Sequence, residues 1–232
     1  MGRLKRWLSK RRALREAQEL VARSSEGNTV DVADNDVRRL KLRIVGRGNV
    51  VRIGRLLGGG ELRIDVFGDG NEIVIGDDVA VGASLAIGAG ADHANFGPVH
   101  NCRIAIGRGS SFERARLLTL NSNASFAIGE NCMVAFNVEL YHTDAHPVYE
   151  LGGDTPINRV RELRIGDHVW IGANATLLKN THVADGSIVA WGSVVSGRFT
   201  EPNCVIAGNP ARVVKRGVCW KHGDSHYIEN ET

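Results

Sequence analysis

The chain has 232 residues, of which 43% are hydrophobic, 24% charged and 6% aromatic, and its formal net charge is +3. This length suits one sizeable domain rather than two. No stretch approaches the roughly 18 apolar residues of a membrane span, and no apolar core follows the N-terminal charges as in a signal peptide. The cysteines show neither a CxxC pair nor metal-ligand spacing, which favours a reduced, cytoplasmic protein; they are Cys102, Cys132, Cys204 and Cys219.

The first segment of the chain is basic. Residues 1 to 23 carry eight Lys and Arg against Glu16 and Glu19, so this stretch has a charge of +6 and the remainder −3. Its apolar residues fall near one face of a helix: Leu4, Trp7, Leu8, Leu14 and Val21. We therefore predict a basic amphipathic segment at residues 1–26. It either packs on the protein or rests peripherally on the inner face of an anionic membrane. Basic charge without interleaved aromatics is weak evidence for nucleic-acid binding, and we expect none.

The next stretch, up to about residue 70, contains short alternating runs with glycine turns. Examples are Leu42-Arg-Ile-Val-Gly, Val51-Arg-Ile-Gly and Leu62-Arg-Ile-Asp-Val. These runs predict strands. We interpret them as the atypical first coils of a repeat fold, because terminal repeats usually depart from the pattern. A separate small β-domain is the alternative.

From residue 75 onwards an aliphatic residue returns every sixth position. The anchors are Ile75, Val81, Ile87, Ile106, Ile128, Val134, Leu140, Ile165, Ile171, Leu177, Val183, Val189 and Val195. The residue after the anchor and the fifth residue of each hexapeptide are mostly small, as Cys132 is. Neither a helix nor an ordinary strand has this period. Six-residue spacing is typical of a parallel β-helix, whose anchors point inward and stack from coil to coil.

The register is interrupted twice. Ile87 and Ile106 are nineteen residues apart, and the turn between them carries His93 and His100, which we expect to be exposed. A longer interruption separates Leu140 from Ile165 and predicts a protruding loop at about 146–163. An excursion of that length is uncommon without a function, because its backbone must find hydrogen bonds outside the ladder. We therefore look for the chemistry here.

Three segments carry a family resemblance. They are Ile128-Gly-Glu-Asn-Cys-Met-Val-Ala-Phe-Asn-Val-Glu-Leu140, His146-Pro147 followed by Ile165-Gly-Asp-His-Val-Trp-Ile-Gly, and Val189-Ala-Trp-Gly-Ser-Val-Val continuing through Ala207-Gly-Asn-Pro-Ala-Arg-Val-Val-Lys215. Over residues 70 to 215 the chain resembles the hexapeptide-repeat acyltransferases, and in pattern the galactoside, maltose and polysaccharide O-acetyltransferases. The resemblance implies an all-β, left-handed parallel β-helix at residues 27–215 with a C-terminal tail at 216–232. It also implies acetyl-CoA as co-substrate and a homotrimer.

The same resemblance assigns the general base to His146. An alcohol is a poor nucleophile near neutral pH, and an imidazole can take its proton and later return it to the leaving thiolate. The expected activity is direct transfer of an acetyl group from acetyl-CoA to a hydroxyl of a sugar or polysaccharide. His142 competes for the role; it follows the anchor Leu140 by two positions, and we expect it to be an exposed or loop-packing residue.

Further roles follow from the matching positions. The resemblance implies that the Ala173 N–H stabilises the oxyanion. It places Trp170, Trp191 and Gly192 along the acyl-CoA groove, where the bulk of Trp191 departs from the family pattern. Arg212 and Lys215 match the basic positions near the CoA phosphates. For the acceptor we single out Arg116 and Asn121, as a guess at an acidic or polymeric ligand, and Asp144, which either orients the imidazole or binds the sugar.

Two other functions remain open at this stage. One is transfer to the nitrogen of an amino-sugar or another amine, which the same base would serve. The other is a γ-carbonic-anhydrase-like protein, since eight histidines are present and that enzyme class binds a metal between neighbouring subunits. His142 and His146 are four apart, which does not match that class, so we expect no metal. A non-catalytic scaffold with the same coil is a further alternative.

Overall fold

The computed structural model describes residues 27–91 and 96–222. The predicted amphipathic segment at 1–26, His93 and the end of the predicted tail lie outside the described residues. The described part is all-β and contains 21 strands. No helix in these residues is long and apolar enough to cross a membrane.

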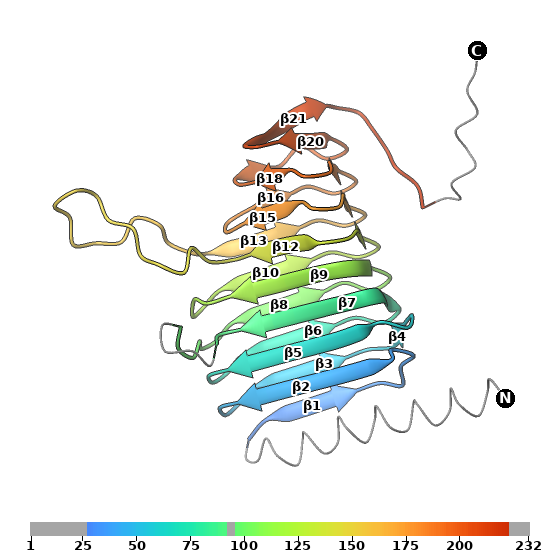
Figure 1. The fold of residues 1–232 in the computed structure, drawn as a ribbon, viewed down its shortest axis with the longest axis vertical. Coiled ribbons are helices and arrows are strands. Elements are labelled where there is room, and N and C mark those ends of the chain that lie inside the picture. Colours follow the sequence, from blue (N-terminus) through green and yellow to red (C-terminus); the bar gives the residue numbers. More distant parts are fainter. Residues whose placement is uncertain (1–26, 92–95, 223–232) are drawn as a thin grey trace.

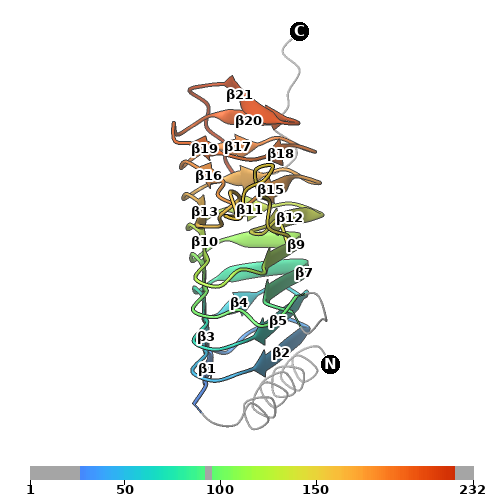
Figure 2. The same ribbon diagram turned by 90° about the vertical axis from the view of Figure 1, so that its left-hand side faces the viewer.

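The strands stack into a column with three faces (Figures 1 and 2). Face 1 consists of β1 (Thr29–Val32), β3 (Val50–Ile53), β6 (Glu72–Ile75), β8 (Arg103–Ile106), β10 (Ser125–Ile128), β13 (Glu162–Ile165), β16 (His182–Val183) and β19 (Arg198–Phe199). Face 2 consists of β4 (Leu56–Leu57), the first parts of β7 (Val79–Ala89) and β9 (Ser111–Thr119), β11 (Met133–Val134), β14 (Trp170–Ile171), β17 (Ile188–Val189) and β20 (Val205–Gly208). Face 3 consists of β2 (Arg39–Val45), β5 (Glu61–Phe67), the second parts of β7 and β9, β12 (Val138–Tyr141), β15 (Thr176–Leu178) and β18 (Val194–Val195). The pairing along all three faces is parallel, and β21 (Ala211–Lys215) ends the column by pairing antiparallel with β20.

The coil is left-handed, as the resemblance implies. In Figure 1 the chain climbs from β1 towards β21, and the near strands β5, β7 and β9 run to the left. Figure 2 shows these strands on the opposite side of the column from β10 and β13. A chain that rises while it turns in this sense forms a left-handed helix, whereas ordinary parallel crossovers are right-handed.

The interior consists of three stacks of apolar side chains, one for each face. On face 1 the register aligns Ile75, Ile106, Ile128, Ile165 and Val183. On face 2 it aligns Val81, Phe112, Val134, Ile171, Val189 and Ile206. On face 3 it aligns Ile64, Ile87, Leu117, Leu140, Leu177 and Val195. All of these side chains are at most 3% exposed, so the predicted hexapeptide anchors are confirmed. Full burial of one such side chain stabilises the fold by about 1.5–3 kcal/mol.

Small and polar side chains fill the corners of the coil. Cys132 is buried as predicted, its Sγ contacts the carbonyl of Gly166 at 3.1 Å, and burial raises its pKa to about 11. In the lower coils the side chains of Asn49 and Asn71 are fully buried, and each accepts a backbone N–H from the next coil. Such ladders satisfy the backbone groups that face the interior where the strands end.

The first coils continue the same column. β1 pairs with β3 and β3 with β6 on face 1, while β2 pairs with β5 and β5 with β7 on face 3. The strands β2 and β5 have seven residues each, which is longer than a hexapeptide strand and explains why the six-residue pattern is weak there.

Candidate active site

The long excursion leaves the coil at the corner between faces 3 and 1. β12 ends at Tyr141 and β13 begins at Glu162, and the chain between them projects from the column (Figure 1). The two strands lie in adjoining faces of the same coil. The projecting loop predicted at about 146–163 is therefore present, and its first residues remain attached to the coil.

His142 corrects one expectation. Of the two alternatives that we expected, exposed or loop-packing, the exposed one is wrong: His142 is fully buried and packs beneath the returning end of the loop, against the Arg161 carbonyl. The inward and outward alternation of β12 continues beyond its last residue: Leu140 points in, Tyr141 is half-buried, and the His142 N–H donates to the Leu118 carbonyl at 2.8 Å. The residue two positions after an inward anchor therefore also points inward.

The ring of His142 lies among apolar and backbone groups. It meets the Phe126 ring edge-on at 6.2 Å between centroids, and its Nε2 lies 3.4 Å from the Arg161 carbonyl. Its Nδ1 has no hydrogen-bond partner among the described residues. Burial lowers the pKa of His142, because a charged imidazolium is poorly solvated there. His142 is thus a neutral histidine beneath the loop, with no exposed atom to offer an acceptor.

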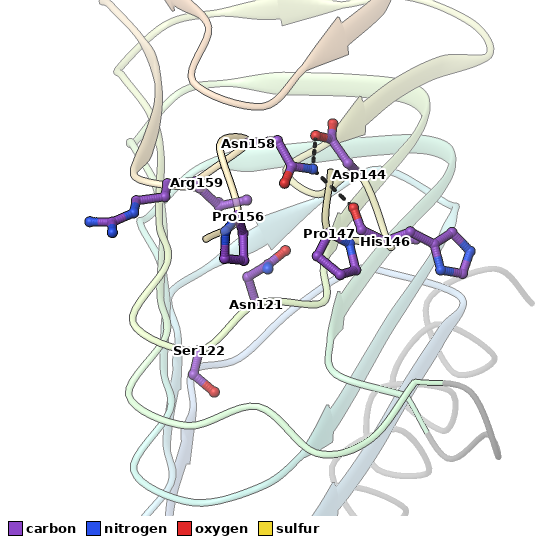
Figure 3. A pocket seen from close by; sticks show the side chains of 10 residues that line it. Asn121, Ser122, Asp144, His146, Pro147, Pro156, Asn158 and Arg159 are labelled. Atoms are coloured by element: carbon purple, nitrogen blue, oxygen red, sulfur yellow. Dashed lines mark hydrogen bonds between the residues drawn. The ribbon is translucent and has the colours of Figure 1, made fainter. Parts of the chain in front are cut away.

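Asn158 closes the loop upon itself. Its Nδ2 donates to the Asp144 carboxylate at 2.6 Å and to the His146 carbonyl at 2.9 Å (Figure 3). Its Oδ1 accepts the Val148 N–H at 2.8 Å. One amide side chain therefore joins the returning arm of the loop to the departing arm on both sides of His146.

Lys179 ties this closed loop to the coil above. Its Nζ lies 3.0 Å from the Asp144 carboxylate, and its side chain is 21% exposed. Asp144 thus has two partners, and both contacts restrain the backbone before His146. Neither contact reaches the His146 imidazole, so Asp144 acts here on the main chain of the loop and not on the ring.

The main chain at His146 is also constrained. Ala145 has a φ of 62°, a conformation that non-glycine residues seldom adopt. Its N–H donates to Thr143 Oγ1 at 2.9 Å, and the His146 N–H donates to the Asp144 carbonyl at 2.6 Å. Unusual backbone of this kind persists where the surroundings hold it, and it is frequent at functional sites.

A hollow of about 380 Å³ opens beneath the loop. Its lining includes Asn121, Asp144, Pro147, Pro156 and Asn158 (Figure 3). The Asn121 Oδ1 is buried without a partner among the described residues. The structure therefore brings the predicted Asn121, Asp144 and His146 together around one space.

The imidazole of His146 points out of this hollow. Figure 3 shows its ring pointing away from Asn121 and Pro156, on the other side of Pro147. The side chain is exposed, and its ring centroid lies 6.0 Å from that of Phe96, in the shorter excursion between β7 and β8. The ring is therefore exposed, with Phe96 as its aromatic neighbour.

Ala173 lies at a different corner, between faces 2 and 3. Its carbonyl accepts the Gly192 N–H from the coil above at 2.9 Å. Its own N–H has no acceptor among the residues that the structure describes. A backbone donor without a partner is suited to bind a ligand oxygen.

Trp191 and Gly192 lie directly above this corner, whereas Trp170 and Lys215 belong to one row across face 2. Trp191 is 74% exposed, Trp170 is 36% exposed, and Gly192 has a φ of 68°. Arg212 and Lys215 are exposed on β21, where Arg212 Nη1 donates to the Ala211 carbonyl at 2.7 Å. This corner thus combines bare backbone with an exposed indole, and two exposed cations lie on the last strand above face 2, where they could contact phosphates.

The two halves of the predicted site do not meet in one chain. Ala173 and Lys179 stand at opposite ends of the β15 segment of face 3, and Lys179 contacts the loop of His146. Because a strand rises about 3.3 Å per residue, the six steps between them cover roughly 15 to 20 Å. In the reaction, the thioester carbonyl must lie about 3 Å from both the attacking hydroxyl and the oxyanion donor. Within one chain, the Ala173 N–H therefore lies far from Lys179, the residue that ties the His146 loop to the coil.

Arg116 lies apart from the hollow as well. It points outward from face 3, where its Nε donates to Glu139 at 2.8 Å and its Nη2 contacts the Tyr141 hydroxyl. Across residues 27–91 and 96–222, no three His, Cys, Asp or Glu side chains gather closely enough to hold a metal ion.

Sequence reasoning missed Asn158 and Lys179. Neither has a spacing signal, since Asn158 stands in the irregular loop and Lys179 stands in an ordinary turn of the coil. A carboxylate two residues before the predicted base could have suggested that partners exist, but not which residues they are.

Comparison with known proteins agrees with this description. The family model "Hexapeptide repeat of succinyl-transferase" matches residues 162–196. The chain is 30% identical over 195 residues to the polysialic acid O-acetyltransferase of Neisseria meningitidis, covering 83% of this chain and 85% of that protein. The crystal structure of the polysialic acid O-acetyltransferase OatWY superposes with a TM-score of 0.67 at 26% identity, over 87% of this chain and 92% of the other. That of the polySia-specific acetyltransferase NeuO has a TM-score of 0.74 at 24% identity, covers 88% of both chains, and supports the fold.

Proposed function

Because this chain belongs to the hexapeptide-repeat acyltransferases, we propose that it transfers the acetyl group of acetyl-CoA to a hydroxyl of a glycan. The relative with 30% identity is an O-acetyltransferase of a polysaccharide, which supports a glycan acceptor. The observation that carries the proposal is the placement of His146. Its imidazole is exposed, and a hydrogen bond to its carbonyl fixes its backbone at the start of the closed loop.

In the proposed mechanism His146 acts as general base. Its imidazole takes the proton of the acceptor hydroxyl while the oxygen attacks the thioester carbonyl. The carbon–sulfur bond then breaks, and the proton passes from His146 to the leaving thiolate. The acetyl group moves directly to the sugar, and no side chain of the protein becomes acylated.

The negative charge on the carbonyl oxygen needs a donor. We assign this role to the Ala173 N–H, which has no acceptor among the described residues. A fixed amide donor stabilises charge as it develops, and removal of such a donor typically costs about 10²–10³-fold in turnover. The CoA arm would lie along Trp170, Trp191 and Gly192, with its phosphates at Arg212 and Lys215.

We further propose that the enzyme is a homotrimer whose sites combine two subunits. His146 and Ala173 lie at opposite edges of face 3, so the base of one chain must meet the Ala173 corner of the next. A head-to-tail contact of this kind closes into a ring. Face 2 has the composition that a subunit contact needs: its outward row in the upper coils is Met133, Trp170, Ile188 and Val205.

The experiment that tests the function is thiol release from acetyl-CoA with glycan acceptors. We expect acceptor-dependent release by the intact protein and loss of that release in His146→Ala. Acceptor-dependent release that persisted unchanged in His146→Ala would overturn the assigned mechanism. No release with any hydroxylated or amine acceptor would overturn the function itself.

A further inference from the structure

The chain does not leave the column after β21. Residues 216–222, which we call the strap, turn back and descend along the corner between faces 1 and 2 (Figure 1). Near its start, Arg216 Nε donates to the Glu201 carboxylate at 2.9 Å, and the Val218 N–H donates to the Asn203 carbonyl at 2.9 Å. Both acceptors stand in the turn between β19 and β20, so the strap is attached to the top of the column first.

Trp220 fixes the lower end of the strap. It is 7% exposed, and its ring stacks on that of His168 with 4.1 Å between the centroids and 4° between the planes. The Trp220 Nε1–H donates to the His168 carbonyl at 2.8 Å, and His168 Nε2 lies 3.0 Å from the Trp220 carbonyl. His168 stands in the turn between β13 and β14, two coils below the turn that holds the upper contacts. One stacked ring and two polar contacts thus hold the indole in place.

Trp220 does not belong to the stacks inside the column. The interior cluster of buried side chains extends from Val37 to Ala211 without it, and the indole packs on the outside of the corner. Its other aromatic neighbour is Trp170, at 6.3 Å between the centroids and 49° between the planes. The strap therefore brings a second indole to the point where Trp170 projects from β14.

Trp170 is an outward side chain on a flat face. It is 36% exposed, and in register it stands between Met133 below and Ile188 above. These neighbours limit its movement along the row, and Trp220 stands at the edge of the face towards the corner. A side chain has several staggered rotamers. Those that turn the Trp170 indole over the corner would meet Trp220, so the strap keeps this indole on face 2.

Restraint of Trp170 bears on ligand binding. In the proposed function the arm of CoA lies along Trp170, Trp191 and Gly192. A ligand that packs on a mobile side chain has to immobilise it, and for one side chain this weakens binding by about two- to tenfold. A side chain that the protein already holds avoids the loss.

We propose that Trp220 is a positioning residue of the acyl-donor site. It holds the indole of Trp170 in the orientation that packs against CoA, and it sets the affinity for acetyl-CoA without touching the ligand. The inference rests on the proposed acetyl transfer, in which Trp170 belongs to the donor site. It adds the strap, a segment far in the sequence from the loop of His146, to the parts of the chain that determine turnover at low donor concentration.

The test uses the full-length protein with two substitutions of Trp220. Trp220→Leu keeps apolar volume in the strap, and Trp220→Phe also keeps an aromatic ring. The matched control is Cys219→Ser, because Cys219 is the exposed neighbour of Trp220 in the same strap. Trp220→Leu is made in a Trp170→Ala background as well. Thiol release gives kcat and the KM for acetyl-CoA, and calorimetry gives the Kd of acetyl-CoA.

Fluorine NMR reports on Trp170 directly. The chain has four tryptophans, so labelling with 5-fluorotryptophan gives one signal for each, and the signal lost in Trp170→Ala belongs to Trp170. The intact protein should give a single Trp170 signal, and acetyl-CoA should shift it. In Trp220→Leu this signal should move or split, whereas in Cys219→Ser it should stay where it is.

We expect Trp220→Leu to raise the KM and the Kd for acetyl-CoA by about two- to tenfold while kcat stays within about twofold, the pattern of a lost binding contribution. Trp220→Phe should restore most of the affinity. In the Trp170→Ala background Trp220→Leu should have no further effect, because the two residues act through one contact. A purely structural role of the strap would raise KM by the same factor in both backgrounds.

The inference is wrong if Trp220→Leu and Cys219→Ser have the same KM, if Trp220→Leu has the same effect with and without Trp170, or if the intact protein already gives several Trp170 signals. The last result needs no substitution of Trp220, so it decides the matter even where Trp220→Leu does not fold. Failure of the proposed function has a different signature. Acetyl-CoA then leaves the signals of the intact protein unchanged and no acceptor releases thiol, which overturns the donor site and this inference together; when the inference alone fails, the intact protein still binds acetyl-CoA.

Discussion

His146 depends on its neighbours for its position. Its carbonyl is held by Asn158, its N–H by the Asp144 carbonyl, and Asp144 in turn by Lys179. None of these contacts involves the imidazole, so the ring is free to meet a ligand while its backbone is fixed. The imidazole and the residues that fix its backbone can therefore be substituted separately, and each substitution tests a different part of the chemistry.

The first prediction concerns the base. His146→Ala should lower turnover by about 10²–10⁴-fold, because a positioned base contributes that much. The KM for acetyl-CoA should change little, since the base touches the acceptor. The melting temperature should stay close to that of the intact protein because the side chain is exposed. Steady-state kinetics and a thermal melt check both, and a large loss of stability would point to a structural role instead.

The second prediction concerns Asn158. Asn158→Ala removes the bridge between the two arms of the loop, so it should lower kcat about tenfold or more by misplacing His146. Binding of CoA should be unchanged, and amide hydrogen exchange in residues 147–157 should become faster. Asn131→Ala, at an exposed corner between faces 1 and 2, is the matched control and should leave both quantities as they are. Equal exchange rates in the two variants would show that Asn158 does not close the loop.

The third prediction concerns His142. Its pKa is lowered by burial from the ordinary value of 6.5, so the unfolded chain binds a proton more readily than the folded one. Stability should therefore be complete above about pH 6.5 and should decline as the pH falls from there towards the lowered folded pKa. Melting temperatures measured from neutral to mildly acidic pH should show this slope.

A variant separates His142 from the other titrating groups. In His142→Leu the contribution of this residue to the slope should disappear, whatever its effect on stability at neutral pH. Two identical pH profiles would show that His142 does not titrate on unfolding. The acidic and basic neighbours Glu162 and Lys179 remain in both proteins, so they do not affect the comparison.

At the scale of the element, the main chains of successive coils pack directly against each other at the corners. Gly107 illustrates the requirement, since a Cβ built there would come within 2.4 Å of the Gly129 carbonyl carbon in the next coil. Backbone cannot rotate away as the end of a side chain can. On face 1 the small residue after the anchor is therefore a packing requirement and not merely a feature of the repeat.

The fourth prediction uses this contrast. Gly107→Ala should lower the free energy of unfolding by about 1–3 kcal/mol, as overpacking does. Gly59→Ala is the control, because a Cβ there meets nothing within 4 Å; it should be neutral or raise stability by about 0.5 kcal/mol through the unfolded state. Urea unfolding of both variants checks this. Equal midpoints would mean that the corners have more room than the contact distances indicate.

At the scale of the whole molecule, the decisive feature is the separation of His146 from Ala173 across face 3. The fifth prediction follows from it. His146→Ala and Arg212→Glu/Lys215→Glu should each be inactive alone. When the two are unfolded and refolded together in equal amounts, about a quarter of the sites in random cyclic trimers should combine an intact base with an intact CoA corner.

Activity of the mixed preparation reports on the shared site. Recovery near that fraction, together with a trimer by light scattering, agrees with the proposal. A fully active monomer, or a mixture no more active than its components, contradicts it. Ile188→Glu on the apolar row of face 2 should dissociate the trimer and abolish activity together.

The sequence alone determined the β-helix. In a coil each inward position is repeated every six residues, so the aliphatic anchors from Ile75 to Val195 report burial directly, and all lie in the three interior stacks. The resemblance carried by three segments led to the family and marked His146. Both inferences rest on local properties of the chain, namely the direction of each side chain and the identity of short motifs.

Only the tertiary structure decided which residues of the loop and of the coils contact one another. His142 is buried because the alternation of β12 continues past its last residue, and Asn158 and Lys179 hold Asp144 because the loop folds back onto the coil. Contacts of this kind depend on how the loop closes and how the coils stack, and no spacing within the chain records them.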